Sequence, residues 1–260
     1  MTTMTSPKQP QTILFLGATG GVGLSALRRS LAAGHTCLAL CRTPSKLAAH
    51  FPSPPPANLH LIPGNAHDST TLATSCLHNP TDRTRPVDTI VFSIGARPTL
   101  RGMDDAHVCE TGMAALLAAL KQCREEQNGN GGVVVRGGKT RLVAVSSTGI
   151  SDYGRDLPWL MMPLYKVLLH TPHADKKAME RLVMGSGEWT EWTLVRGSLY
   201  TDGPETEGLV REGMEDPVTG VVESVAVGYT ISREDVGKWV FENCVEGGRK
   251  WVGKAAVVTY

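Results

Sequence analysis

Four glycines near the start of the sequence form the part of this chain that is best suited to bind a charged phosphate group. They are Gly17, Gly20, Gly21 and Gly23, with Thr19 and Val22 between them. An apolar run over residues 12–16 precedes them and leucines at helical spacing follow, so the pattern predicts a strand, a tight turn and a helix. Glycines in such a turn allow backbone N–H groups to approach a diphosphate at the positive end of the helix. We therefore expect this segment to bind the pyrophosphate of a dinucleotide.

A second candidate contact to the dinucleotide follows the next predicted strand, residues 36–41. Arg42 stands there, about 20 residues after the glycines, where the pattern places the group that contacts the 2′ position of the adenosine ribose. An acidic residue would suit NAD, whereas a guanidinium can donate two charge-assisted hydrogen bonds to a 2′-phosphate. Lys46 could complete the phosphate pocket. The sequence thus predicts NADPH as the cofactor, and a solvated arginine at a strand end is the alternative.

Hydroxyl groups at the ends of two further predicted strands are candidates for contact with the reacting end of the cofactor. Ser93 and Gly95 end one strand and are expected near a ribose, where Gly95 allows close approach of the backbone. Ser146 and Ser147 end the next strand and could bond a carboxamide or a substrate oxygen, with a capping role as the alternative. His173 could supply a proton near neutral pH, although a solvated loop histidine is the commoner case. Two tyrosines are reserve donors: Tyr153 and Tyr200.

Alternating strands and helices position these residues. Strands are expected at 12–16, 36–41, 58–63, 87–93, 141–146, 192–196 and 251–260, and helices after the glycines, at 69–77, 106–121 and 175–184, and from 232 onward. Such alternation implies parallel β-α-β crossovers, which predicts a Rossmann-type, doubly wound α/β fold with a mainly parallel sheet. Ser232 and Asp235 resemble a capping box at the start of the last helix. Residues 51–57 and 125–140, rich in proline and glycine respectively, are expected to be surface loops.

The C-terminal third differs from this pattern. Residues 198–223 are rich in Gly, Glu and Thr and suit a mobile segment over a substrate site. We expect residues 11–260 to form a single domain, with 198–260 contributing its small substrate-covering portion, after a disordered tail over residues 1–10. The apolar run 157–169 could line a hydrophobic substrate pocket, pack in the core or form the face of a homodimer.

Composition limits the classes of partner. The 26 basic and 25 acidic residues almost cancel, so composition gives no electrostatic footprint for nucleic acid or an anionic membrane. No apolar run approaches the ~18 residues of a membrane span, and residues 1–10 lack the apolar core of a signal peptide. The six cysteines show no spacing typical of a metal site, so buried, reduced thiols in a cytoplasmic protein explain them best. We expect a small-molecule substrate and no metal.

Together these segments resemble the atypical short-chain dehydrogenase/reductases, in particular the NAD(P)H-binding group of NmrA-like proteins and flavin reductases. The matching segments run in the family order across nearly the whole chain: 17–23, 41–46, 143–149, 174–180, 195–203 and 231–236. The resemblance implies one Rossmann-type sheet with the substrate pocket at its C-terminal edge. It also implies that Lys176 contacts the ribose hydroxyls of the cofactor and lowers a neighbouring pKa, and that Asn65 lies by the adenine, where the family often has an aspartate.

The chain departs from the family where proton transfer is normally done. A short-chain dehydrogenase usually carries a tyrosine four residues before its lysine, and Pro172 occupies that position if Lys176 is that lysine. Tyr165 and Lys166 do not have the required spacing. Gly197 stands where a proline is usual. Simple alcohol or ketone chemistry is therefore not expected.

The sequence as a whole predicts an NADPH-dependent reductase that transfers hydride to an apolar, electron-poor small molecule such as a quinone, flavin, enone or imine, in secondary metabolism. Such acceptors need less help from an acid than a ketone does. Ser147, His173 and Lys176 are the expected catalytic residues. Two alternatives stay open: an isomerase or cyclase on a repurposed reductase fold, and an NADP(H)-sensing binding protein of the NmrA-like kind.

Overall fold

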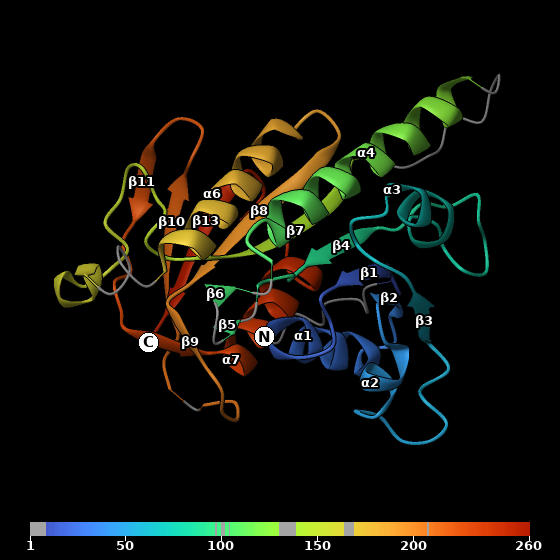
Figure 1. Cartoon of the computed structure of the whole chain (residues 1–260), viewed down its shortest axis with the longest axis horizontal. Helices are drawn as coiled ribbons and strands as arrows, with labels where there is room; N and C mark the ends of the chain where they lie inside the picture. Colours follow the sequence, from blue (N-terminus) through green and yellow to red (C-terminus); the bar gives the residue numbers. More distant parts are fainter. Residues whose placement is uncertain are drawn as a thin grey trace, which may run out of the picture.

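A nine-stranded sheet forms the centre of the computed structural model, which describes residues 9–96, 98–99, 102–103, 105–129, 139–163, 169–206 and 208–260. Its strands are β1 (Thr12–Leu16), β2 (Thr36–Cys41), β3 (Leu59–Pro63), β4 (Thr89–Phe92), β7 (Thr140–Ser147), β8 (Thr190–Gly197), β10 (Arg211–Asp216), β11 (Val221–Ser224) and β13 (Lys254–Thr259). Figure 1 shows them side by side in the order β11-β10-β13-β8-β7-β4-β1-β2-β3.

The pairing of these strands is parallel except around β10, which runs antiparallel to both β13 and β11. The chain builds outward from β1 in one direction through β2 and β3, and in the other through β4, β7, β8 and β13. Neighbouring strands β1 and β4 therefore lead into connections that leave in opposite directions, which makes their carboxyl ends the switch point of the sheet. This arrangement confirms the predicted Rossmann-type, doubly wound α/β fold.

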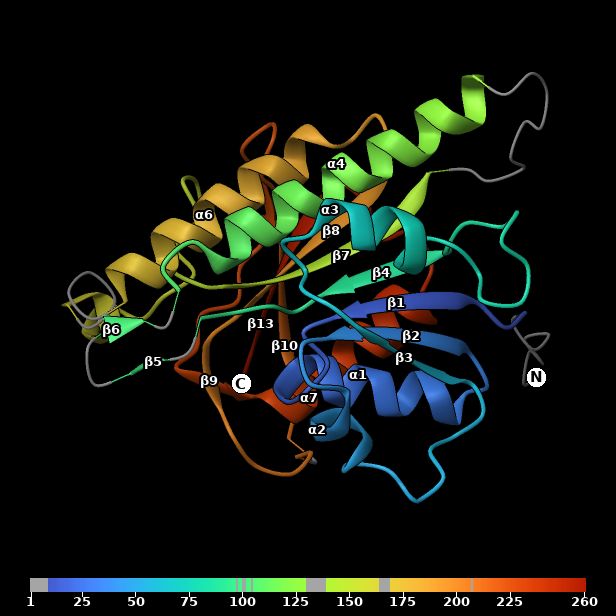
Figure 2. The same cartoon turned by 45° about the vertical axis from the view of Figure 1, so that its right-hand side comes forward.

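Helices cover both faces of the sheet, as Figure 2 shows. The lower layer in that view consists of α1 (Gly21–Ala32), α2 (Pro44–Ala48) and α7 (Arg233–Val240). The upper layer consists of α3 (Ser69–Thr71), α4 (Val108–Gly129) and α6 (His170–Gly185), with a π-helical turn, η1 (Leu72–Cys76), after α3. The remaining short elements are β5 (Pro98–Thr99), β6 (Gly102–Met103), η2 (Trp159–Met161), β9 (Leu199–Thr201), β12 (Thr230–Ser232) and η3 (Phe241–Val245).

The core has two halves because successive side chains of a strand point to opposite faces. Ile13 and Phe15 of β1 are buried with Leu27 of α1 on one face. Leu14 and Leu16 are buried on the other face in the cluster that contains residues of α4 and α6. The central strands thus bury both faces, which explains why they appear in the sequence as continuous apolar runs.

Two predicted helix boundaries are corrected by the structure. Helix α4 continues to Gly129, so residues 125–129 are helical and not part of a loop. Helix α6 begins at His170, five residues before the predicted start, because a proline is tolerated in the first helical turn, where N–H groups have no intrahelical partner. Pro172 and His173 are therefore helical.

The structure differs from the expected cover over residues 198–223 in the second half of that segment. Residues 211–216 and 221–224 form β10 and β11 at the edge of the sheet, because backbone pairing with β13 is available there. Only its first residues reach the site described below. Helix α7 begins as predicted, with Ser232 Oγ accepting a hydrogen bond from Asp235 N at 3.0 Å.

Some expectations fall on other parts of the chain. Residues 1–8 of the predicted tail, residues 130–138 of the second predicted loop, and Tyr165 and Lys166 lie outside the described residues. All six cysteines are buried and none forms a disulfide. Of the helices that the structure describes, none has both the length and the apolar character needed to cross a bilayer.

Candidate functional site

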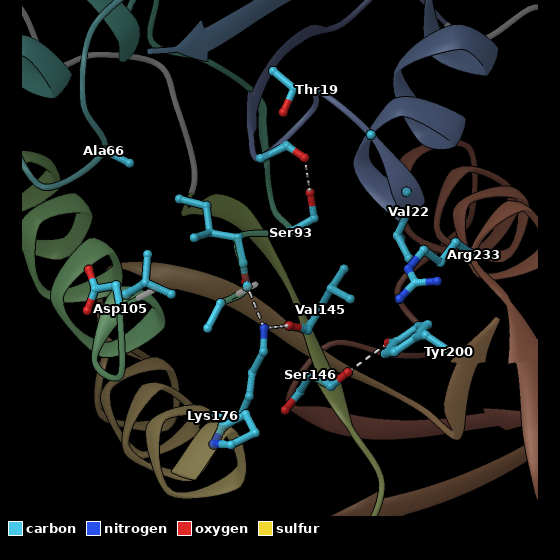
Figure 3. Close-up of a pocket in the computed structure, with 18 of the residues that line it drawn as sticks. Thr19, Val22, Ala66, Ser93, Asp105, Val145, Ser146, Lys176, Tyr200 and Arg233 are labelled. Carbon is cyan, nitrogen blue, oxygen red and sulfur yellow. Dashed lines mark hydrogen bonds between the residues drawn. The ribbon is translucent and has the colours of Figure 1, made fainter. Parts of the chain in front are cut away.

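A cleft of about 1120 Å³ opens at the carboxyl ends of the parallel strands, at the switch point between β1 and β4. The two strand ends are tied together there, since Ser93 Oγ lies 3.1 Å from Leu16 O and 3.2 Å from Gly17 O. Figure 3 shows the cleft bounded by the glycine turn on one side and by Lys176, Ser146 and Tyr200 on the other. Ligands of open α/β sheets bind at this position.

The glycine turn and the start of α1 form the middle of the cleft. Gly17 has φ +92°, and a Cβ on it would lie 2.7 Å from the backbone carbon of Ser93, so only glycine fits there. Gly23 is equally constrained, because a Cβ would lie 2.3 Å from Ser93 Oγ. Gly20 differs: no protein atom lies within 4 Å of the position of its Cβ. The turn therefore packs tightly against β4 and leaves open space in front of Gly20.

The N-terminus of α1 has no side chain to bind its first N–H groups. Gly20 is its N-cap and supplies no capping hydrogen bond, and no acidic residue lies in the first turn. These N–H groups carry the positive end of the helix dipole, which suits an anionic ligand. Their partners must come from the cleft or from solvent.

Basic side chains lie at the β2–β3 end of the cleft. Arg42 directly follows β2 and Lys46 lies on α2, and both are exposed cleft-lining residues. Asn65 and His67 line the same end from the connection after β3. The acidic residues of the lining are Asp105 and Asp202, and neither belongs to this end of the sheet. A ligand bound at this end of the cleft would lie close to positively charged side chains.

Lys176 spans the opposite end of the cleft. Its Nζ donates hydrogen bonds to Ile94 O at 2.8 Å and to Val145 O at 2.7 Å (Figure 3). These two bonds use two of the three N–H donors of the ammonium group. The lysine thus joins the carboxyl ends of β4 and β7 and brings a positive charge between them.

Asp175, next to Lys176, fixes α6 in place. Its carboxylate accepts hydrogen bonds from the first-turn N–H groups of α4, at 3.0 Å from Cys109 N and 2.8 Å from Glu110 N. The acidic group thereby satisfies two N–H groups at the positive end of α4. These hydrogen bonds fix the position of α6 and therefore of the Lys176 side chain. The sequence pattern did not indicate them.

The serines at the end of β7 differ in their surroundings. Ser146 is fully buried at the edge of the cleft, and its Oγ has no hydrogen-bond partner among the described residues. Ser147 is partly exposed and also lines the cleft. A buried hydroxyl without a partner costs free energy, so Ser146 Oγ is a natural point of contact for a bound polar group.

Tyr200 of β9 lines the cleft, but its hydroxyl already has partners. The OH donates to Ser146 O at 2.7 Å and accepts from Gly197 N at 3.2 Å. A Cβ on Gly197 would lie 2.5 Å from the Tyr200 ring, so the position of that ring requires glycine at residue 197. Tyr153, the other reserve donor, is 57% exposed and does not line the cleft.

His173 lines the cleft beside Pro172 from the first turn of α6. Burial lowers the pKa of His173 to about 4, with a smaller contribution from the charge of His170. The imidazole is therefore neutral at pH 7, and the expected supply of a proton from its charged form is not supported. A neutral imidazole carries one donor and one acceptor nitrogen.

A buried ionic cluster lies behind the serines. Arg196 of β8 donates to Glu180 at 3.0 and 2.7 Å and to Glu215 at 2.8 Å, and all three side chains are almost fully buried. Asp156 lies nearby in the loop after β7, where its Oδ1 accepts from Gly149 N at 2.9 Å. Its Oδ2 has no partner among the described residues, and burial raises the pKa of Asp156 to about 6.

Replacement of Asp156 by asparagine is expected to stabilise the protein above pH 6. The folded-state pKa of Asp156 lies above its unfolded value, so its contribution to stability is complete below about pH 4 and is lost as the pH rises to about 6. Asparagine resembles the protonated acid and does not ionise. The free energy of unfolding of Asp156→Asn should match that of the wild type at pH 4 and exceed it by about 1–3 kcal/mol at pH 7.5. Urea titrations at both pH values measure this difference, and a constant difference would contradict it.

Of the binding and catalytic residues that the sequence predicted for the site, the reserve donors apart, all but one line the cleft. They are Gly17, Thr19, Gly20, Gly21, Val22, Arg42, Lys46, Asn65, Ser93, Gly95, Ser146, Ser147, His173 and Lys176. Gly23 instead packs behind the turn against Ser93. Sequence analysis missed Arg233 and Asp202, which line the cleft and form an ion pair at 2.8 Å. The match of segment 231–236 was the signal that could have drawn attention to Arg233.

These residues fit a dinucleotide. Uncapped N–H groups of α1 face the open space at Gly20, basic side chains lie at one end, and the unpartnered Ser146 Oγ lies at the other. The glycine turn would hold the pyrophosphate. Arg42 and Lys46 would hold the adenosine half, and Lys176 and Ser146 would hold the nicotinamide half.

Two named fungal proteins are similar to this chain over almost their full lengths. The chain is 37% identical to reductase pytE of Aspergillus terreus over an alignment of 272 residues. The alignment covers 96% of this chain and 98% of that protein. The chain is 34% identical over 285 residues to oxidase pynE of Aspergillus niger, which covers 95% of this chain and 98% of that protein. Both names describe redox enzymes.

Solved structures share the fold. ChuY, an anaerobillin reductase from Escherichia coli O157:H7, superposes with a TM-score of 0.64 at 16% identity and covers 95% of this chain and 96% of its own. The oxidoreductase ylbE from Lactococcus lactis superposes with a TM-score of 0.63 at 16% identity. The match covers 95% of this chain and 90% of ylbE. The NAD(P)H-binding family profile matches residues 17–246. The NAD(P)H-binding group inferred from the motifs is thereby confirmed, and the chain belongs to the NAD(P)H-binding family.

Proposed function

We propose that this protein is an NADPH-dependent reductase that transfers hydride to an apolar, electron-poor small molecule, such as a quinone, flavin, enone or imine, in secondary metabolism. One observation carries the proposal: a single cleft joins the glycine turn to a basic end at Arg42 and Lys46 and to an end at Lys176, where Pro172 stands four residues before the lysine. The redox names of the fungal relatives support hydride chemistry.

The end of the cleft on the β4–β7–β8 side supports an apolar substrate. Its lining includes apolar side chains from four segments of the chain: Ile94, Val108, Leu169, Pro172 and Leu199. Bound NADPH would supply the hydride at this end. Lys176 and the serines would orient the acceptor and stabilise the negative charge that develops on it.

The residue at the position of the family tyrosine supports an acceptor that is already electron-poor. Pro172 lines the cleft four residues before Lys176, and the Tyr200 hydroxyl donates its proton to Ser146 O. Quinones, flavins, enones and imines accept hydride with little help from an acid, so the proton can follow from solvent. A ketone would require a positioned donor.

Preference for NADPH over NADH is expected to depend on Arg42. A charge-assisted pair with the 2′-phosphate is worth about 1.5–3 kcal/mol, or about 10- to 100-fold in affinity. Calorimetric titration of the wild type should give dissociation constants that differ by that order, and Arg42→Ala should make them equal. Arg83→Ala is a suitable control, because Arg83 lies outside the cleft and donates to Thr74 O. Equal affinities in the wild type would contradict the assignment.

A cofactor titration followed by an NADPH-oxidation screen with quinones, flavins and enones tests the function itself. Oxidation with at least one class supports the proposal. Tight binding without oxidation of NADPH by any of them would favour a sensing protein. Conversion of a substrate without net change in the cofactor would favour an isomerase or cyclase.

A further inference from the structure

Arg233 lies beside the glycine turn, although it is not part of the glycine motif. It is the first residue of α7, and its side chain lines the cleft. A Cβ on Gly21 would lie 3.0 Å from Arg233 Cδ and 3.7 Å from its Nε, so the arginine lies directly over the first residue of α1. Figure 3 shows its guanidinium between Val22 and Tyr200. The carbon of that guanidinium lies 5.8 Å from the centroid of the Tyr200 ring.

The packing of α7 on α1 fixes this position. Gly237 allows the two helices to approach closely, since a Cβ there would lie 2.3 Å from Ser25 Cβ. Ser25 Oγ donates to Glu234 O at 2.9 Å, which ties the first turn of α7 to α1. The backbone of Arg233 is therefore held beside the start of α1.

The ion pair between Asp202 and Arg233 is weak. Asp202 follows β9, its side chain is 92% exposed, and that of Arg233 is 38% exposed. Exposed ion pairs contribute little free energy because water and salt screen them. Arg233 can exchange this carboxylate for a stronger, doubly charged anion at small cost.

We propose that Arg233 is a pyrophosphate-binding residue and that Asp202 competes with the pyrophosphate for its guanidinium. The proposal rests on dinucleotide binding in the proposed function, but not on the preference for NADPH. Two positive groups, the N-terminus of α1 and Arg233, face the same space at Gly21. An anion between them satisfies both, whereas in its absence Asp202 supplies the negative charge. Asp202 thereby lowers the affinity of the protein for the dinucleotide and favours its release.

Calorimetric titration of four proteins tests the proposal: the wild type, Arg233→Gln, Asp202→Asn and the double variant. The ligands are NADP⁺, NAD⁺ and adenosine 2′-monophosphate, which lacks the pyrophosphate. Arg233→Gln is expected to weaken binding of both dinucleotides by about 10- to 100-fold. It should leave the affinity for adenosine 2′-monophosphate unchanged.

Asp202→Asn is expected to change affinity in the opposite direction, by about 2- to 5-fold tighter binding of both dinucleotides. A folding defect cannot produce this gain. In the Arg233→Gln background the same substitution should have no effect, because the guanidinium for which Asp202 competes is absent. Arg249→Gln is the matched control, since Arg249 pairs with Glu191 at 2.6 Å outside the cleft.

Three results would overturn the proposal: unchanged dinucleotide affinity in Arg233→Gln, equal losses for the dinucleotides and adenosine 2′-monophosphate, or weaker binding in Asp202→Asn. The affinities of the wild type for NADP⁺ and NAD⁺ test the proposed function separately. A wild type that prefers NAD⁺ refutes the NADPH assignment and still tests Arg233. A wild type that binds neither dinucleotide refutes both.

Discussion

Valine in place of Gly20 is expected to abolish dinucleotide binding and to leave the fold intact. The backbone at Gly20 is extended, with φ 175°, so a residue other than glycine is not strained there. No protein atom lies within 4 Å of its Cβ position, so the new side chain points into open cleft. That space is where a pyrophosphate must lie to reach the N–H groups of α1. Loss of several charge-assisted hydrogen bonds, each worth about 1.5–3 kcal/mol, should weaken binding by more than about 1,000-fold.

Thermal melts with and without NADPH measure both parts of this expectation. The Gly20→Val protein should melt near the wild-type temperature and show no upward shift with NADPH. Gly23→Val is the contrasting variant, because its side chain would collide with Ser93 Oγ at 2.3 Å and Gly17 O at 2.7 Å. It should unfold at a clearly lower temperature even without ligand. A shift with NADPH that persists in Gly20→Val would show that the dinucleotide binds elsewhere.

The dinucleotide half of the site could be predicted because its determinants are local in sequence. A strand, a glycine turn and a helix follow one another over residues 12–32, and Arg42 is fixed by the end of the next strand. The structure explains the turn, since Gly17 has a positive φ and lies against Ser93. Lys176 was placed by its spacing in a family motif, and the ends of β4 and β7 confirm that it lies in the cleft.

What the sequence could not predict depends on contacts between distant segments. Arg233 reaches the turn only because α7 packs on α1, and no periodicity within residues 231–236 indicates that packing. The low pKa of His173 arises from burial, which depends on how α6 lies over the cleft. Residues 211–216 pair with β13 where a mobile cover was expected, because a short strand with many polar residues resembles a loop in sequence.

Lys176 is expected to contribute more to hydride transfer than any hydroxyl group of the cleft. Its ammonium joins Ile94 O and Val145 O, and methionine would keep the stem but leave both carbonyls without that donor. Lys176→Met should weaken dinucleotide binding by about 10- to 100-fold and slow single-turnover hydride transfer by about 100- to 1,000-fold at saturating cofactor. Lys177→Met is the matched control, because the next lysine pairs with Asp152 and does not line the cleft.

Smaller effects are expected at the hydroxyl groups, and Tyr200 gives the critical comparison. Tyr200→Phe removes a hydroxyl that bridges Gly197 N and Ser146 O, so it should lower the free energy of unfolding by about 1–3 kcal/mol. Single-turnover hydride transfer should fall by no more than about tenfold in this variant and in Ser147→Ala, because an electron-poor acceptor needs orientation more than a dedicated acid. Tyr153→Phe, far more exposed, should have no effect. A loss greater than about 1,000-fold in Tyr200→Phe alone, with cofactor affinity unchanged, would identify a displaced tyrosine acid and contradict this mechanism.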